Sequence, residues 1–219
     1  AVEKAERYRI PFGITPYYIS LMDKESDRKY DHAVRAQVIP PLSYVESFAH
    51  SKQERGMRFD FMGEHDTSPV DLVTRRYPEV LILKPYNSCS QICVYCQRNW
   101  EIEKVMDPKA VCKPETIDRA IEWIKSHKSI RDVLVTGGDP FVLTDAKLRR
   151  IFDQIADIDH VNRIRIGSRM PVVIPFRITD ELCDMLERYV QPGKREVCVV
   201  THFEHPYEVT PEAAQAVLK

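Results

Sequence analysis

Short apolar runs alternate along the chain with segments whose apolar residues recur every three or four positions. The runs fall at residues 80–83, 133–135, 163–166 and 197–200, and their lengths are typical of strands. The run at 80–83 is continuous, as expected of a strand that is covered on both faces. The segments after the first three runs have the i, i+3, i+4, i+7 spacing of amphipathic helices. The spaced residues are Ile117, Ala120, Ile121 and Ile124, then Leu148, Ile151, Phe152 and Ile155, then Leu182, Met185, Leu186 and Tyr189.

Strand and helix thus alternate four times, with Thr210 as N-cap and Pro211 at the first position of the fourth helix. This alternation predicts an α/β fold with a parallel sheet and right-handed crossovers. Four units do not close a barrel. The pattern leaves two architectures, an open sheet or a barrel whose later units lie outside these 219 residues.

Residues 1–73 differ from the rest, with mixed periodicity, many prolines and charge-rich stretches. We expect a mainly helical N-terminal arm with one short helix and a second helix near 42–52. It should pack on a larger body formed by residues 74–219, so the two ranges are our predicted domains.

Composition excludes several classes of function. The formal net charge is −1, so bulk electrostatics favour neither nucleic acid nor an anionic membrane as a partner. No apolar run approaches the roughly 20 residues of a membrane span. Six cysteines without a secretion signal are typical of a reducing compartment, so we expect a cytoplasmic protein. Cys112, Cys183 and Cys198 are scattered, and each is most simply a small buried apolar residue.

The remaining three cysteines, Cys89, Cys93 and Cys96, lie in one short segment after the first predicted strand. Their spacing places three thiolates on one side of a tight loop, where they can hold three irons of a [4Fe–4S] cluster and leave the fourth open. A structural zinc site usually needs four ligands, and a disulfide framework is typical of small secreted chains. The segment resembles the CxxxCxΦC motif of radical S-adenosylmethionine (SAM) enzymes, with Tyr95 as the aromatic residue.

Polar or glycine-rich segments follow the other predicted strands, at 137–139, 167–169 and 201–202. In a parallel barrel, the carboxyl ends of the strands carry the chemistry. Gly137-Gly138-Asp139 is similar to the GGE element with which radical SAM enzymes bind the amino group of SAM. A plain strand-to-helix turn is the alternative.

Three further candidates are single residues or pairs. Arg98 lies two residues after the last of the three cysteines, and its planar guanidinium can bind a substrate carboxylate through two hydrogen bonds. Arg76 and Tyr77 precede the first strand and are candidates for a phosphate site. Surface charge explains these arginines equally well. His202 is a possible ligand donor, although a structural role is the better expectation for a lone histidine, as it is for His205.

Taken together, the motifs resemble the lysine 2,3-aminomutase family of radical SAM enzymes. They occur in the family's order, and the resemblance covers nearly the whole chain. The segments are RRYP (75–78), CSxxCxxC (89–96), DVLVTGGDP (132–140), RIGSRxPVV (165–173) and THFxHPxE (201–208), with FGITPYY (12–18) and RAQVIP (35–40) in the arm.

The resemblance implies a partial (β/α)6-type barrel, a [4Fe–4S] cluster, SAM and pyridoxal phosphate (PLP). It also implies an amino-acid 2,3-aminomutase that uses a 5′-deoxyadenosyl radical and a PLP imine, with lysine and glutamate as the first substrates to test. A flavodoxin or ferredoxin would donate the electron, and we expect a homo-oligomer. No residue is assigned as catalytic. The residues carried over are Cys89, Cys93 and Cys96 for the cluster, Arg98 for the substrate carboxylate, Tyr95, Gly137, Gly138, Asp139, Ser168 and His202 for SAM, and Arg76 and Tyr77 for the PLP phosphate.

Several departures from the family indicate a divergent subgroup. Val80 stands where family members often have an arginine, Tyr95 replaces a frequent histidine, and Phe176 replaces a frequent glutamine. The family's Schiff-base lysine lies in later strands, so it is not in this chain, and Lys219 does not take its place. We therefore expect these residues to be part of a longer protein.

Other functions remain open from the sequence. One is a related enzyme that acts on a lysyl side chain of a protein such as an elongation factor. A second is a radical SAM enzyme that does not use PLP. The non-enzymatic alternatives are an Fe–S electron-transfer module and a zinc-binding interaction protein.

Overall fold

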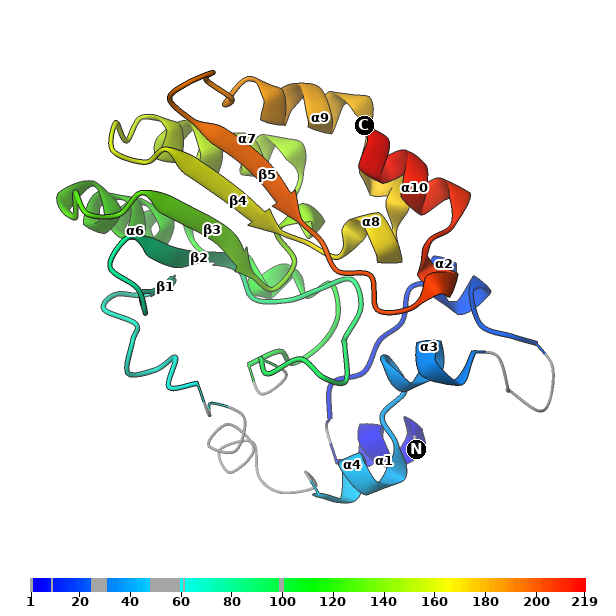
Figure 1. Cartoon of the computed structure of the whole chain (residues 1–219). Helices are drawn as coiled ribbons and strands as arrows, with labels where there is room; N and C mark the ends of the chain where they lie inside the picture. The colour runs from blue at the N-terminus through cyan, green and yellow to red at the C-terminus, as the bar shows by residue number, and fades with distance from the viewer. Residues whose placement is uncertain (1, 9, 25–30, 48–59, 61, 99–100) are drawn as a thin grey trace.

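The sheet that organises the chain has five strands in the order β1-β2-β3-β4-β5 (Figure 1). The computed structural model describes residues 2–8, 10–24, 31–47, 60, 62–98 and 101–219. The strands are β1 (Val73–Thr74), β2 (Val80–Tyr86), β3 (Asp132–Gly137), β4 (Arg163–Gly167) and β5 (Glu196–Val200). β1 is antiparallel to β2, and the other neighbours are parallel. The predicted α/β class and parallel sheet are confirmed, and the arrangement is that of part of a barrel.

Three helices cover one face of this sheet (Figure 1). They are α6 (Pro114–Ser126), α7 (Asp145–Ala156) and α9 (Asp180–Glu187). Each buries most of the apolar stripe predicted from its spacing; Ile117 is only partly buried, and Tyr189 lies just beyond the end of α9. Thr179 caps α9 by accepting a hydrogen bond from the Leu182 amide at 3.2 Å, and Thr210 caps α10 (Pro211–Leu218) in the same way through the Ala213 amide at 3.1 Å.

The strands bury alternate residues against these helices. The fully buried set is Leu81, Leu83, Val133, Val135, Ile164 and Ile166. On the opposite face of the sheet, Val80 and Ile82 are only partly buried, in contrast to the predicted strand covered on both faces. Lys84 and Arg165 lie on the same face and are also only partly buried, so in the described residues this inner face is less completely covered than the face under the helices.

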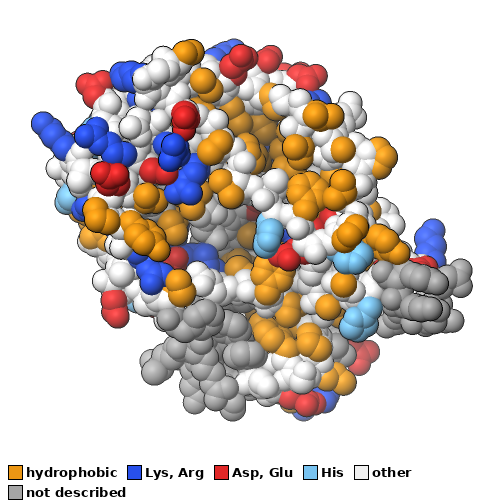
Figure 2. All heavy atoms as spheres, in the orientation of Figure 1, with side chains coloured by type: hydrophobic (Ala, Val, Ile, Leu, Met, Phe, Trp, Pro, Cys, Tyr) orange, Lys and Arg blue, Asp and Glu red, His pale blue; other side chains and the backbone are white. Residues whose placement is uncertain are grey.

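One edge of the sheet is exposed. Every residue of β5 except Val197 is exposed. Large apolar side chains that remain exposed on β5 and on α10 are Val199, Val200, Val217 and Leu218. Hydrophobic side chains also gather on the side of the molecule where α8 (Met170–Val173) and α10 lie (Figure 2).

Four short helices form the described part of the N-terminal arm, where one short helix and a second near 42–52 were predicted. They are α1 (Val2–Arg7), α2 (Pro16–Ser20), α3 (His32–Ala36) and α4 (Leu42–Ser47). The second helix was predicted near 42–52, and its part from 48 onward lies outside the described residues. The arm packs on the rest of the chain, since the Thr15 hydroxyl donates to the Val173 carbonyl at 2.6 Å.

Four 3₁₀ helices complete the described elements: η1 (Pro108–Ala110), η2 (Pro140–Val142), η3 (Pro175–Arg177) and η4 (Pro206–Glu208). No helix in the described part of the chain is long and apolar enough to cross a membrane.

Candidate functional site

The three cysteines lie together in the loop that follows the carboxyl end of β2. Burial raises the pKa of Cys89 well above its ordinary value, and the nearby Asp139, Cys96 and Cys93 raise it further. Burial also raises the pKa of Cys96 to about 11. None of the three is in a disulfide. They therefore form one group of neighbouring thiols.

The N-terminal arm holds this loop through backbone hydrogen bonds. The Ile92 amide donates to the Gly13 carbonyl at 2.9 Å, and the Val94 amide donates to the Gln37 carbonyl at 2.7 Å. Because both bonds are made inside the cysteine segment, the arm sets the course of the chain between the three thiols.

The donor set fits an iron–sulfur cluster better than a single ion. Within the described ranges, no three His, Cys, Asp or Glu side chains are grouped closely enough to hold one metal ion. A [4Fe–4S] cluster takes one thiolate per iron, so its ligands need not converge on one point. Three soft sulfur donors in one partly buried loop therefore fit the cluster, and the grouping gives no support to a zinc site.

The Gly137-Gly138-Asp139 segment lies directly against this loop. The Gly138 amide donates to the Tyr86 carbonyl at 2.8 Å, and the Asp139 amide donates to the Ser88 carbonyl at 2.9 Å. A Cβ atom at Gly138 would lie 2.0 Å from the Ser88 carbonyl oxygen. Residue 138 must therefore be glycine for the end of β3 to meet the loop.

Asp139 and Ser168 join the ends of β3 and β4. The buried Asp139 carboxylate accepts from the Phe141 amide at 3.0 Å, the Ser168 hydroxyl at 2.7 Å and the Arg169 amide at 2.9 Å. Burial raises the pKa of Asp139, and these three hydrogen bonds oppose the rise. Both side chains are thus engaged within the protein, and their predicted contact with SAM stays a prediction.

Arg169 is a site residue that the sequence did not single out. It follows Ser168, and its Nη1 donates to the Cys93 sulfur at 3.2 Å. Its Nη2 forms an ion pair with Glu208 at 2.6 Å. The RIGSRxPVV motif contained this arginine, but only the fold shows that it reaches a cysteine 76 residues away.

Tyr95 and His202 lie at the exposed side of the loop. Their rings meet edge to face, with centroids 6.4 Å apart. The His202 side chain is 67% exposed, and its Nδ1 lies 2.9 Å from a carboxylate oxygen of Glu204. Both are accessible to a ligand that approaches the cysteines.

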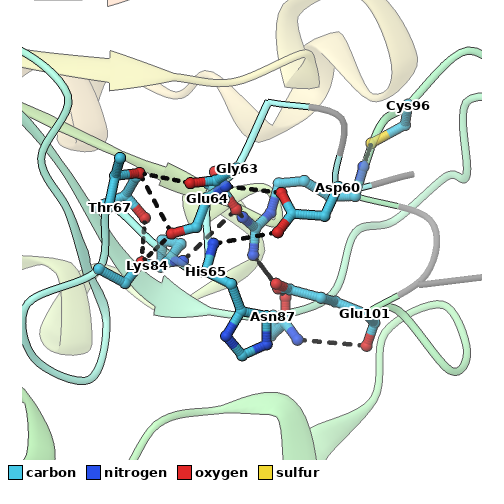
Figure 3. A network of polar contacts seen from close by, with 12 residues as sticks. Asp60, Gly63, Glu64, His65, Thr67, Lys84, Asn87, Cys96 and Glu101 are labelled. Carbon is cyan, nitrogen blue, oxygen red and sulfur yellow. Dashed lines mark hydrogen bonds and ion pairs between the residues drawn. The ribbon is translucent and has the colours of Figure 1, made fainter. Parts of the chain in front are cut away.

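Glu64 and Glu101 belong to one network of polar contacts near Cys96 (Figure 3), and Arg98 is buried beside these two carboxylates. Its two Nη atoms form ion pairs with Glu64 and Glu101, and its amide donates to the Cys96 sulfur at 3.4 Å. Lys84 lies 3.7 Å from the same oxygen of Glu64. A cavity of about 360 Å³ beside this network is lined by Glu64, Lys84 and Glu101 among others. The sequence alone identified neither glutamate.

Arg76 and Tyr77 lie elsewhere. They precede β2, so the seven residues of that strand separate them from the cysteine loop, and both are exposed. The structure brings together the three cysteines with the other predicted residues near them, but it does not bring this pair to the loop. The Cys112 thiol is also separate, and it donates to the Lys84 carbonyl at 3.5 Å.

Comparison with known proteins agrees with this geometry. Residues 83–201 match the radical SAM superfamily. An uncharacterised KamA family protein of Methanocaldococcus jannaschii is 49% identical over 218 residues, which are 100% of this chain and 34% of that protein. An L-lysine 2,3-aminomutase of Fusobacterium nucleatum is 41% identical over 93% of this chain and 44% of its own length. For a glutamate 2,3-aminomutase of Clostridioides difficile the identity is 37%, over 95% of this chain and 45% of that enzyme.

The chain thus spans between a third and a half of the length of these relatives. The resemblance that its motifs suggested is confirmed. The match covers more than half of the chain and includes the cysteine loop and the carboxyl ends of the four parallel strands. The chain belongs to the radical SAM superfamily.

Proposed function

We propose that the protein takes part in a radical SAM reaction that moves the amino group of an amino acid between C2 and C3. The observation that carries the proposal is the group of three partly buried thiols at the carboxyl end of a parallel sheet. Relatives named as lysine and glutamate 2,3-aminomutases support the reaction class, and they make lysine and glutamate the first substrates to test.

Cys89, Cys93 and Cys96 would hold the [4Fe–4S] cluster. When bound, the cluster and SAM supply the one-electron chemistry that generates an organic radical able to remove a hydrogen atom from a substrate. The thiols must lose their protons on binding, so cluster assembly releases protons.

The remaining side chains position ligands around the cysteines. Tyr95 and His202 stand at the exposed side of the loop, where SAM would enter. Arg98 would bind the substrate carboxylate by exchanging one of its two glutamate partners for it, and Glu101 is the more exposed of the two. The adjoining cavity gives room for that exchange.

The test is anaerobic reconstitution with iron and sulfide, followed by electron paramagnetic resonance of the reduced protein with and without SAM. We expect a [4Fe–4S]⁺ signal that shifts on addition of SAM, because SAM would bind the open iron. Cys93→Ser should abolish the signal. The matched control is Cys198→Ser, since Cys198 is an exposed residue of β5. A signal indifferent to SAM, or no iron, would refute the proposal.

The placement of Arg76 and Tyr77 favours a second candidate, a radical SAM enzyme that does not use PLP. Both side chains are exposed beyond the far end of β2 from the cysteines. Addition of PLP to the reconstituted protein distinguishes the two candidate functions. Amino-group migration that depends on PLP supports the aminomutase, and activity independent of PLP supports the second candidate. A cytoplasmic location, a flavodoxin or ferredoxin donor and a homo-oligomer are further proposals.

A further inference from the structure

The Arg169 guanidinium is enclosed by three separate parts of the chain. Nη1 donates to the Cys93 sulfur at 3.2 Å, and Nη2 donates to Gln37 Oε1 at 2.5 Å and to Glu208 Oε1 at 2.6 Å. Nε donates to the His202 carbonyl at 3.4 Å. Its side chain is only 11% exposed. A fixed positive charge thus lies in contact with one of the three thiols.

Glu208 is the counter-charge that holds this arginine. It is fully buried, and its Oε1 also accepts from the Tyr18 hydroxyl at 2.5 Å. Its Oε2 accepts from the Glu204 amide at 2.6 Å and from the His205 amide at 3.4 Å. With four donors on its two oxygens, the carboxylate has a fixed position, and it fixes Arg169 in turn.

Aromatic rings cover the guanidinium. Its central carbon lies 5.6 Å from the centroid of the Tyr18 ring and 5.8 Å from that of Tyr95. Cation–π contacts of this length are favourable, and the rings displace water that would otherwise screen the charge. The positive charge therefore acts on the Cys93 sulfur at low local dielectric.

We propose that Arg169 is a positioning residue that donates a charge-assisted hydrogen bond to the cluster-bound Cys93 thiolate and raises the reduction potential of the cluster. The inference rests on the proposed function only in that the three cysteines bind a [4Fe–4S] cluster. A low-potential one-electron donor of the flavodoxin or ferredoxin class adds one electron and takes the core from 2+ to 1+, with no bond made or broken.

The reason is electrostatic. With three thiolates, the site carries one more negative charge after reduction than before, and a neighbouring cation stabilises the reduced form more than the oxidised form. Hydrogen bonds to cluster sulfurs are a recognised means by which a protein sets the potential. An arginine that serves only as a structural ion pair would stabilise the fold and leave the potential unchanged.

The experiment compares Arg169→Gln, Arg169→Lys and the control Arg163→Gln. Arg163 is the first residue of β4, is exposed and pairs with Glu196 at 3.0 Å. Its replacement by glutamine therefore removes an equal charge at the other end of the strand. Each protein is reconstituted anaerobically, its iron and sulfide are counted, and its midpoint potential is measured by redox titration followed by electron paramagnetic resonance.

We expect Arg169→Gln to lower the equilibrium constant for one-electron reduction about tenfold, which is about 59 mV for one electron. Arg169→Lys should lower this equilibrium constant less, because lysine keeps the positive charge but lacks the planar guanidinium that contacts Cys93 and Glu208 at once. Arg163→Gln should leave it unchanged.

Equal potentials in wild type and in both Arg169 variants would overturn the inference while leaving the proposed function intact. If Arg169→Gln does not retain iron, the test rests on Arg169→Lys. A midpoint potential of Arg169→Lys below that of wild type supports the inference, and an equal potential overturns it. A wild-type protein that binds no cluster would refute the proposed function itself, and this inference with it.

Discussion

Replacing Gly138 by alanine adds one methyl group where the end of β3 touches the cysteine loop. The new Cβ would lie 2.0 Å from the Ser88 carbonyl oxygen, 2.5 Å from its amide nitrogen and 2.7 Å from its carbonyl carbon. All three are backbone atoms, so no side-chain rotation relieves the overlap. The loop must move away from β3.

The free-energy cost follows from what that movement breaks. The hydrogen bonds from the amides of Gly138 and Asp139 to the Tyr86 and Ser88 carbonyls are both lost or lengthened. At about 1 kcal/mol each they contribute roughly 2 kcal/mol. Forcing an extra methyl into a packed site adds about 1–3 kcal/mol. We expect Gly138→Ala to lower the free energy of unfolding by about 3–5 kcal/mol.

Two measurements test this expectation. Urea unfolding of the cluster-free protein gives the change in stability, and iron content after reconstitution shows whether the displaced loop still binds a cluster. The control is Gly193→Ala, because a Cβ there meets nothing within 4 Å and the only cost is its positive φ of 75°. That cost is about 1–2 kcal/mol, and iron content should be unaffected.

The result that would refute the reasoning is specific. If Gly138→Ala retains full iron content and is destabilised no more than Gly193→Ala, the contact between β3 and the cysteine loop does not control the site.

Two further predictions concern a buried arginine and a partly buried thiol. Arg98→Gln should lower the free energy of unfolding by about 2–3 kcal/mol, because it leaves Glu101 without its cation and Glu64 with only Lys84, at 3.7 Å. Urea unfolding checks this, and a loss below 1 kcal/mol would contradict it. Burial raises the pKa of the Cys112 thiol from 9.0 to about 11, so its thiolate fraction at pH 8 should be about 100-fold below that of an ordinary thiol. Timed alkylation followed by peptide mapping should show a rate that increases with pH up to about 11, and a plateau near pH 9 would contradict the prediction.

The fold was largely predictable because its elements follow from local patterns. Apolar runs marked the four parallel strands, and helical spacing within residues 117–124, 148–155 and 182–189 marked the three covering helices. What the pattern missed was the partial exposure of the inner face of β2. That property depends on what lies opposite the strand, and a run of four apolar residues carries no information about it.

The site was predictable only where one segment supplied all its members. The three cysteines lie within eight residues, so their spacing alone indicated a cluster. Arg169 and Glu208 are 39 residues apart, and Arg98 and Glu64 are 34 apart. No local pattern marks such a pair, because an arginine or a glutamate in a polar stretch has the same appearance whether it is buried or solvated.

The hydrogen bonds of the N-terminal arm have a consequence for the order in which the protein forms. Thr15 bonds to a carbonyl 158 residues later in the chain, and Tyr18 bonds to a carboxylate 190 residues later. Contacts of such long sequence separation carry a high loop-closure entropy, which slows their formation. A chain emerging from the ribosome therefore exposes Cys89, Cys93 and Cys96 well before Glu208 exists to anchor Tyr18. Until residue 208 has been synthesised, the Arg169 guanidinium that contacts Cys93 therefore has no Glu208 to pair with.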